Sequence, residues 1–336
     1  MLTQPDNEAI KLTIGIPIYN GEKTISETLD SIFRQITTGI EVVISNNAST
    51  DRTEEIVQSY CRKYSQIKYH KNAFNLGYDK NVDLTVTRAT GKYVWLMGDD
   101  DEIAPGGIEY IQNVIDKNPD LAAIFVNYSC YERFTGRCMN QRMLNIERDV
   151  ICHDADSFLR TTTIYTNFIS SIVAKRSLWL KSASTTYIGT LWIQFGTLLE
   201  IIQGQTAFCV ATPYVMNRGV EFDGPNSANR YGVAVSILMN LIDILDNLPK
   251  TVFTNDSIAE ARSEAHKLLL RKIFSSKRDG LKVNVNLISR MIKTFGRYPI
   301  FWICELPIMM LPRYFHFLAW KLYKSGKPKI FFKLLN

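Results

Sequence analysis

Short apolar runs alternate with helical patterns over the first hundred residues, and each apolar run ends in a polar loop. The run 12–18 leads into the polar residues 19–22, and the run 40–44 leads into 45–51. Between them, apolar residues recur at helical spacing over 23–35. This alternation predicts an α/β fold with a doubly wound, mainly parallel sheet. In such sheets the ligand crevice lies beyond the carboxyl ends of the strands.

Three adjacent carboxylates, Asp99, Asp100 and Asp101, follow the apolar run 93–98 at the same expected edge. Like charges held this close repel one another unless a cation compensates them. Carboxylate oxygens suit Mg²⁺ and Mn²⁺, and a divalent ion at a strand end can grip a diphosphate. The alternative is a solvated acidic turn ahead of Pro105. The residues before the triplet favour the metal site.

The cysteines and the N-terminus indicate a cellular compartment. The six cysteines are scattered without a C-x-x-C pair, so we expect neither a zinc site nor a disulfide framework. A reducing compartment is therefore favoured. Residues 1–11 are polar where a signal peptide needs an apolar run. We expect a cytoplasmic protein.

The end of the chain is basic and rich in aromatic residues. Residues 262–336 hold 16 Lys and Arg but 3 Asp and Glu, although the whole chain carries only +6. The apolar stretch 298–323 is interrupted by Glu305, Pro307 and Pro312, so it does not meet the requirement for a spanning helix. Basic residues flank this apolar stretch, and such an arrangement suits helices lying on an anionic membrane surface. The alternative is a helical cap packed on the sheet, with solvated lysines.

The middle of the chain continues the sheet before the pattern becomes helical. Apolar runs at 122–127, 168–173 and 208–211 predict further strands, and 133–149 reads as an irregular insertion or lid. From about residue 230 the pattern is helical to the end.

Five segments together resemble a known family. They are 14–20 (Ile-Gly-Ile-Pro-Ile-Tyr-Asn), 41–51 (ending Asn-Asn-Ala-Ser-Thr-Asp), 75–77 (Asn-Leu-Gly), 89–91 (Ala-Thr-Gly) and 98–101 (Gly-Asp-Asp-Asp). Their order and spacing resemble family 2 glycosyltransferases with the GT-A fold, over about residues 12–220 and most strongly over 12–110. The Gly-Asp-Asp-Asp form looks most like the abequosyltransferase-type subgroup, which builds bacterial O-antigen chains.

The resemblance implies a nucleotide-sugar donor and a divalent ion, Mg²⁺ or Mn²⁺, that neutralises the departing diphosphate. It implies a metal site at Asp99, Asp100 and Asp101. The family's usual Leu-Asp-x-Asp-Asp pattern places its first Asp at Gly98 here, so either Asp99 with Asp101 or Asp100 alone could ligate the ion. The residues expected at the donor nucleotide and sugar are Pro17, Tyr19, Asn20, Asn46, Asp51, Asp99 and Asp100.

Asn46 stands where the family usually carries an Asp. An Asn amide can satisfy both N3 and the amino group of cytosine, so a cytidine donor is one hypothesis among CDP-, UDP-, GDP- and dTDP-sugars. The alternative is that Asn46 caps the following helix.

The segment 187–194 departs from the family pattern. Inverting members carry Glu-Asp at the start of a helix there, and the Asp is the general base. This segment has no carboxylate, which leaves Glu200, Glu221 and Asp223 as candidate bases. Trp192 could stack on an acceptor sugar or lie in the core. Arg218 could hold a phosphate or form a surface ion pair.

We therefore expect a glycosyltransferase that moves a sugar, such as the 3,6-dideoxyhexose abequose, onto a lipid-linked oligosaccharide. Its GT-A domain would span 1–228, with a donor half at 12–110 and an acceptor half at 111–228. The helical region 229–336 would bring it to the inner face of the cell membrane as a peripheral protein. Nucleic acid is not an expected partner. The alternative is a non-catalytic GT-A-like module that binds a nucleotide sugar or scaffolds an assembly complex.

Overall fold

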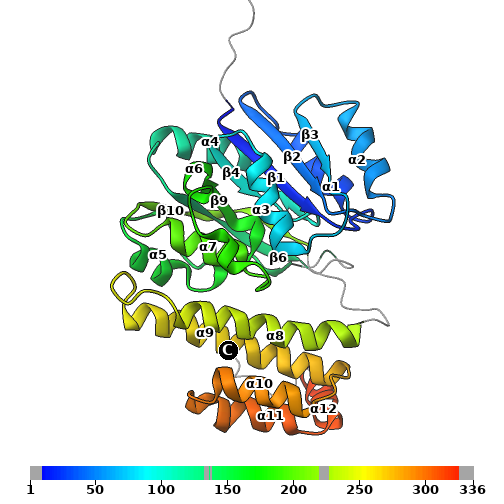
Figure 1. Cartoon of the computed structure of the whole chain (residues 1–336), viewed down its shortest axis with the longest axis vertical. Coiled ribbons are helices and arrows are strands. Elements are labelled where there is room, and N and C mark those ends of the chain that lie inside the picture. Colours follow the sequence, from blue (N-terminus) through cyan, green and yellow to red (C-terminus); the bar gives the residue numbers. More distant parts are fainter. Residues whose placement is uncertain (1–9, 132–135, 137, 219–226, 325–336) are drawn as a thin grey trace, which may run out of the picture. The chain divides into compact units, whose positions relative to one another are not determined.

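The computed structural model describes residues 10–131, 136, 138–218 and 227–324. Contacts divide the chain into two compact units, 1–220 and 221–336. The first unit contains the sheet, and the second is helical (Figure 1). The strands are β1 (Leu12–Ile18), β2 (Ile40–Asn46), β3 (Ile67–Lys71), β4 (Tyr93–Leu96), β5 (Asp101–Ile103), β6 (Ala123–Tyr131), β7 (Cys138–Asn140), β8 (Val150–Cys152), β9 (Ile172–Lys175) and β10 (Ala207–Asn217). The helices of the first unit are α1 (Ile25–Phe33), α2 (Thr53–Cys61), α3 (Tyr78–Arg88), α4 (Gly107–Lys117), α5 (Ala155–Thr162), α6 (Arg176–Trp179) and α7 (Ile193–Ile201).

One sheet runs through the first unit in the order β3-β2-β1-β4-β9-β6-β10-β5, with β7 beside β6 and β8 beside β10. The strands β3, β2, β1 and β4 are parallel, as are β6 and β10. Strand β9 runs antiparallel to both β4 and β6, and so joins the two parallel groups. The predicted α/β fold class is confirmed.

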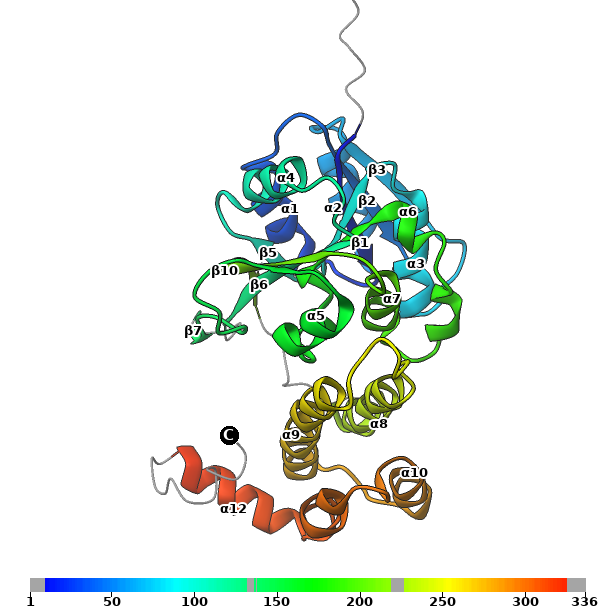
Figure 2. The same cartoon turned by 90° about the vertical axis from the view of Figure 1, so that its left-hand side faces the viewer.

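Helices cover both faces of this sheet, which explains the continuous apolar runs of its central strands. Helices α1 and α4 lie on one face, and α3, α6 and α7 lie on the other (Figure 2). Gly15 lets α3 pack closely on β1, because a Cβ there would come within 2.8 Å of the Thr85 methyl group. The carboxyl ends of β1, β2 and β4 therefore sit in a rigid, buried frame.

The prediction of a strand over 168–173 was wrong at its start. Two short 3₁₀ turns, Tyr165–Asn167 and Ile169–Ser171, precede β9. Ser170 forms hydrogen bonds with β4 and with the loop that follows it. Its carbonyl accepts from Trp95 Nε1 of β4 at 2.9 Å, and its hydroxyl accepts from Gly98 N of the loop at 2.8 Å. Ser170 therefore supports that loop instead of extending the strand.

The second unit is built from α8 (Ser227–Asp246), α9 (Asn255–Asp279), α10 (Val285–Phe295), a π-helical segment (Phe301–Glu305), α11 (Leu306–Met310) and α12 (Arg313–Lys324). Helices α8 and α9 pack along each other, α10 packs on α8, and α11 and α12 pack on α9. Phe295, Phe301 and Met309 are fully buried in this unit. His266 Nδ1 lies 2.6 Å from Glu305 Oε1 in its interior. The helical pattern predicted from about residue 230 is confirmed as far as Lys324, and the rest of the predicted stretch lies outside the described residues.

A buried carboxylate ties the amino ends of the central strands together. Glu41, on β2, is 2% exposed and forms an ion pair with Lys68 of β3. Its oxygens accept from Thr13 Oγ1 at 2.6 Å, Thr90 N at 2.5 Å and Gly91 N at 3.3 Å. Burial tends to raise the pKa of Glu41, but the hydrogen bonds from Lys68, Thr13 and Thr90 outweigh it and lower that pKa below 4.5. The carboxylate is therefore ionised in the folded protein.

We expect Glu41→Gln to lower the free energy of unfolding by about 2 kcal/mol at neutral pH, because charged hydrogen bonds inside the sheet are lost. The unfolded chain binds its proton near pH 4.5, above the folded-state pKa, so the wild type loses this stabilisation as pH falls below that value. Urea denaturation from pH 7 to pH 3 should show the gap between variant and wild type shrinking. Glu55→Gln, on the exposed Arg52–Glu55 pair, is the control; an equal loss there would contradict the prediction.

Candidate functional site

A cavity of about 420 Å³ opens where the loops after β1, β2 and β4 meet. Four of the residues predicted at the site, Asn20, Asp51, Asp99 and Asp100, line it together. The other lining residues are Glu22, Lys23 and Thr24. The loops meet here because parallel strands deliver their carboxyl ends to one edge.

The loops after β1 and β2 hold each other in place. Asn20 adopts a left-handed backbone with φ of 56°, and its side-chain oxygen accepts from Thr50 N at 2.9 Å. Asp51 accepts from Glu22 N at 3.1 Å and from Thr53 N at 3.1 Å. Burial tends to raise the pKa of Asp51, but the hydrogen bonds from Thr53 and Glu22 outweigh it and lower that pKa. A fixed negative charge therefore lies on one wall of the cavity.

Asp99 also lines the cavity, against α1. Thr28 Oγ1 donates to its carbonyl at 2.9 Å, and Thr24 Oγ1 lies 3.4 Å from its Oδ2. Gly21 allows this approach, because a Cβ there would come within 2.1 Å of Asp99 Oδ2. Burial, followed by the charge of Asp100, raises the pKa of Asp99 to about 7. The site thus concentrates negative charge that a bound cation would relieve.

Asp101 points away from this cavity and into the protein. It is 2% exposed and accepts from Ser170 Oγ at 2.5 Å. Burial and the charge of Asp100 raise its pKa well above the usual value. A side chain at Gly98 would meet the carboxylates of Asp101 and Asp100 at 2.8 and 3.0 Å, which explains why no Asp stands there. The triplet therefore presents Asp99 and Asp100 to the cavity.

Among the described residues, no group of three or more His, Cys, Asp or Glu side chains is arranged to hold a metal ion. Asp99 and Asp100 nevertheless supply hard oxygen donors at the cavity wall. Mg²⁺ commonly uses one or two carboxylates and completes its shell with phosphate oxygens and water. The residues present fit an ion held jointly by the protein and a diphosphate.

Asn46 and Asn47 build the loop after β2 from inside. Asn46 is fully buried; its oxygen accepts from Ser49 N at 2.8 Å, and its nitrogen donates to Tyr69 Oη at 2.8 Å. It closes a turn ahead of α2 and is not the cap of that helix. The cytidine hypothesis requires an accessible Asn46 amide, and this conformation does not provide one.

A network of amide side chains that the sequence analysis missed surrounds Asn47. Its nitrogen donates to Asn75 Oδ1 at 2.8 Å, and its oxygen accepts from Asn72 Nδ2 at 3.0 Å. Asn72 also donates to Asn81 Oδ1 at 3.0 Å and accepts from Arg88 at 2.8 Å. These asparagines lie after β2, after β3 and on α3, so clustering of Asn at one edge was the available signal.

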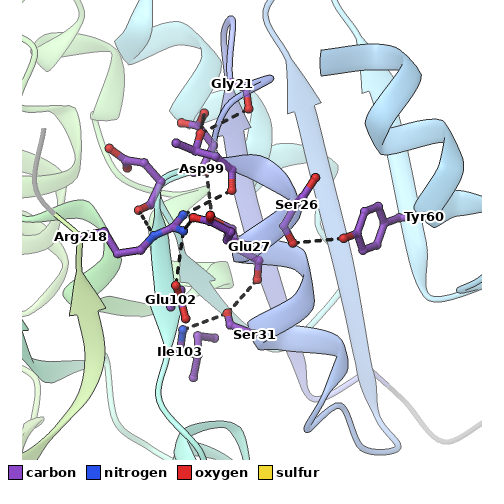
Figure 3. A network of polar contacts seen from close by, with 12 residues as sticks. Gly21, Ser26, Glu27, Ser31, Tyr60, Asp99, Glu102, Ile103 and Arg218 are labelled. Atoms are coloured by element: carbon purple, nitrogen blue, oxygen red, sulfur yellow. Dashed lines mark hydrogen bonds and ion pairs between the residues drawn. The ribbon is translucent and has the colours of Figure 1, made fainter. Parts of the chain in front are cut away.

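Arg218 closes the site from the end of β10. Its guanidinium points between Glu27 on α1 and Glu102 on β5, pairing with both (Figure 3). Its Nε donates to the carbonyl of Asp100 at 2.7 Å. Burial lowers the pKa of Arg218. Arg218 therefore holds the backbone of the acidic loop in place.

The remaining predicted residues are dispersed. Pro17 lies on β1, and Tyr19 is 48% exposed in the loop that follows it. Glu200, on α7, accepts from Ala183 N at 2.7 Å. The other two candidate bases, Glu221 and Asp223, lie outside the described residues.

Comparison with known proteins agrees with this geometry. Residues 13–179 match the family model Glycosyl transferase family 2. The chain is 29% identical over 250 residues to abequosyltransferase RfbV of Salmonella typhimurium, which covers 68% of this chain and 72% of that protein. It is similar to the solved structure of S. aureus TarS 1-349 in complex with UDP-GlcNAc, with TM-score 0.57 and 19% identity over 95% of this chain and 93% of that chain. It is also similar to the mannosyltransferase PcManGT of Pyrobaculum calidifontis in complex with GDP-Man and Mn²⁺, with TM-score 0.50 and 16% identity over 97% and 92%.

We expect Arg218→Met to lower the free energy of unfolding by about 2–3 kcal/mol, because removing one partner leaves part-buried Glu102 and the Asp100 carbonyl without their cation. Urea denaturation at neutral pH measures this. Arg52→Met, at a side chain that is 71% exposed, should change stability far less. Equal losses in the two variants would contradict the structural role of Arg218.

Proposed function

The chain carries a domain of glycosyl transferase family 2 over residues 13–179, and we propose that this domain binds a nucleotide-diphosphate sugar in the cavity between Asp51 and Asp99. The chain is a glycosyltransferase with the GT-A fold. The observation that carries the proposal is the convergence of Asn20, Asp51, Asp99 and Asp100 on one cavity. Pro17 and Tyr19, on the strand and loop that lead to Asn20, would border the base and ribose.

The similarity to an abequosyltransferase supports a role in bacterial surface polysaccharide biosynthesis. Within that role we propose a donor sugar of the 3,6-dideoxyhexose type, such as abequose, and a lipid-linked oligosaccharide as acceptor. Glu200, Glu221 and Asp223 are our candidates for the base that removes the acceptor's hydroxyl proton.

Asp99 and Asp100 would hold a divalent cation, Mg²⁺ or Mn²⁺, together with the donor's phosphates. When bound, the ion would neutralise the charge that develops on the departing diphosphate. The Mn²⁺ and GDP-Man bound by the similar mannosyltransferase support this proposal. The raised pKa of Asp99 also supports it, because a nearby cation would favour the ionised carboxylate.

The second unit presents an unusual number of exposed apolar side chains, which supports association with a membrane surface. They follow α10 closely in the sequence, and Ile303 and Tyr314 are 73% and 67% exposed. No helix of the described residues is long and apolar enough to cross a bilayer. We propose that this apolar surface lies on the anionic inner face of the cell membrane. The apolar surface comprises Ile300, Trp302, Ile303, Met310, Leu311, Tyr314, Phe315 and Phe317.

A non-catalytic module that binds a nucleotide sugar is the second candidate. The observation that favours it is that Ile193, Gln194 and Phe195, at the start of α7, include no carboxylate. Slow hydrolysis of the donor by water, detected as release of free nucleotide diphosphate, separates the two, since a binding module would release none.

We expect one of UDP, CDP, GDP and dTDP to raise the melting temperature in the presence of Mn²⁺ and much less without it. A ligand at 100 times its Kd stabilises the native state by about 2.7 kcal/mol. Differential scanning fluorimetry with each nucleotide, with and without about 1 mM Mn²⁺, measures the shift in melting temperature. Asp99→Asn/Asp100→Asn should abolish the metal-dependent part.

Asp116→Asn is the matched control for that experiment, because Asp116 pairs with Lys11 on the surface, away from the cavity. It should keep the full shift. No shift with any nucleotide in the wild type, or the same shift in the double variant, would contradict the proposed donor site.

We expect Ile303→Glu/Tyr314→Glu to weaken binding to vesicles of anionic phosphatidylglycerol and phosphatidylethanolamine by more than about tenfold, because each buried apolar side chain contributes about 1.5–3 kcal/mol. Cosedimentation measures the bound fraction. Leu180→Glu removes a side chain that is 46% exposed in the first unit and should leave binding unchanged. Unaltered binding of the double variant would rule out this surface.

A further inference from the structure

A buried carboxylate on α3 binds the loop that precedes α7. Asp79 is 3% exposed, and its Oδ2 accepts from Gly189 N at 2.7 Å and from Leu191 N at 3.0 Å. Its Oδ1 accepts from Ile193 N at 3.3 Å, at the first residue of α7. Helices α3 and α7 lie side by side (Figures 1 and 2). One side chain thus fixes three alternate backbone amides of a segment that lies more than a hundred residues later.

The loop has a conformation that needs such a partner. Gly189 and Leu191 have φ of 91° and 64°, in the left-handed region. This region is unfavourable for leucine by roughly 1–2 kcal/mol. Alternating backbone conformations turn successive N–H groups toward one point and form a concave site for an anion. The Asp79 carboxylate occupies that point, so its charge compensates the strain at Leu191.

Trp192 lies between two of the amides that Asp79 holds. Leu191 N and Ile193 N flank it, and its own N–H donates to Thr190 Oγ1 at 3.0 Å. The residue is partly exposed at the start of α7. A partly exposed tryptophan on a fixed backbone is suited to packing against the apolar face of a sugar.

The start of α7 is also linked to the segment that contacts the acidic triplet. Gln194 is buried, and its Nε2 donates to the carbonyl of Asn167 at 2.9 Å. Three residues later, Ser170 donates to Asp101 at 2.5 Å. On the other side of the loop, α3 is fastened to β2 through Asn81, which donates to the Ser45 carbonyl at 2.9 Å. Hydrogen bonds through residues 167–170 therefore link the start of α7 to the loop that follows β4.

We infer that Asp79 is a positioning residue that sets Trp192 as a platform for the acceptor sugar, relative to the donor cavity. The acceptor role rests on the proposed function. Asp79 itself stays buried and does not touch the acceptor. The carboxylate supplies from α3 the negative charge that the start of α7 does not carry in its own sequence.

Asp83 provides a matched control one turn further along α3. It accepts from Trp179 Nε1 and Ser184 Oγ, both at 2.9 Å, and so makes comparable contacts to the same region. Both of these partners lie outside 189–193. Asp83→Asn should therefore cost stability without moving Trp192.

The first measurement is hydrogen exchange of the free protein, read on peptides covering 187–195. We expect Asp79→Asn to speed exchange there by at least about tenfold, whereas Asp83→Asn leaves it near the wild-type rate. Unchanged exchange in Asp79→Asn would overturn the inference. If that variant does not fold, Thr190→Val, which removes the hydrogen bonds of Thr190 Oγ1 to Trp192 N and to the Tyr187 carbonyl, should speed exchange to a smaller degree. No change would equally overturn the inference.

The second measurement is a double-mutant cycle on transfer to octyl hexosides, using the nucleotide sugar whose nucleotide stabilises the protein. Asp79→Asn and Trp192→Leu should each raise the acceptor KM by about tenfold, and the double variant by little more than either. The KM for donor hydrolysis by water should stay within about twofold. Additive effects, or an equal rise in Asp83→Asn, would overturn the inference.

The two measurements separate this inference from the proposed function. If the wild type neither hydrolyses nor transfers from any nucleotide sugar, the proposed function fails. Exchange at 187–195 would still judge whether Asp79 holds the loop.

Discussion

Negative charge packed at the end of β4 is the constraint on which the rest of the site depends. Three consecutive carboxylates follow a buried strand, and burial raises the pKa of two of them. The protein accommodates them by giving each a different environment. Asp101 turns inward to Ser170, Asp99 rests against α1, and Arg218 holds the Asp100 carbonyl. The placement of these three carboxylates therefore determines the shape of the site.

This arrangement also explains the position of elements that have no chemistry of their own. The 3₁₀ turns before β9 exist where they do because Ser170 must reach both Gly98 and Asp101. Arg218, the first residue after β10, forms ion pairs with Glu27 of α1 and Glu102 of β5. Segments from three distant parts of the sequence therefore converge on one loop and hold it by hydrogen bonds.

Much of the fold followed from the sequence, because its signals are local. Buried parallel strands read as unbroken apolar runs, and the polar loops that end them must meet at one edge. That reasoning was enough to bring Asn20, Asp51, Asp99 and Asp100 together at one cavity. The inward turn of Asp101 was not predictable, since it depends on a partner 69 residues away. The burial of Asn46 depends likewise on Tyr69, and the hydrogen bonds from residues 189–193 to Asp79 span 110 to 114 residues. None of these three contacts leaves a periodic pattern in the sequence.

The network around Glu41 has a consequence for how this protein could be modified. Glu41 is the second residue of β2, at the amino edge of the sheet, whereas Asn46 ends the same strand at the edge where the cavity lies. Four residues of one strand therefore separate the hydrogen bonds of Glu41, which hold the strands together, from the loop that leads to the cavity. An engineer could exchange the loops at one edge for a new sugar while leaving the fastening at the other edge untouched. Changes at the carboxyl end of this strand can therefore be made without disturbing the hydrogen bonds that stabilise its amino end.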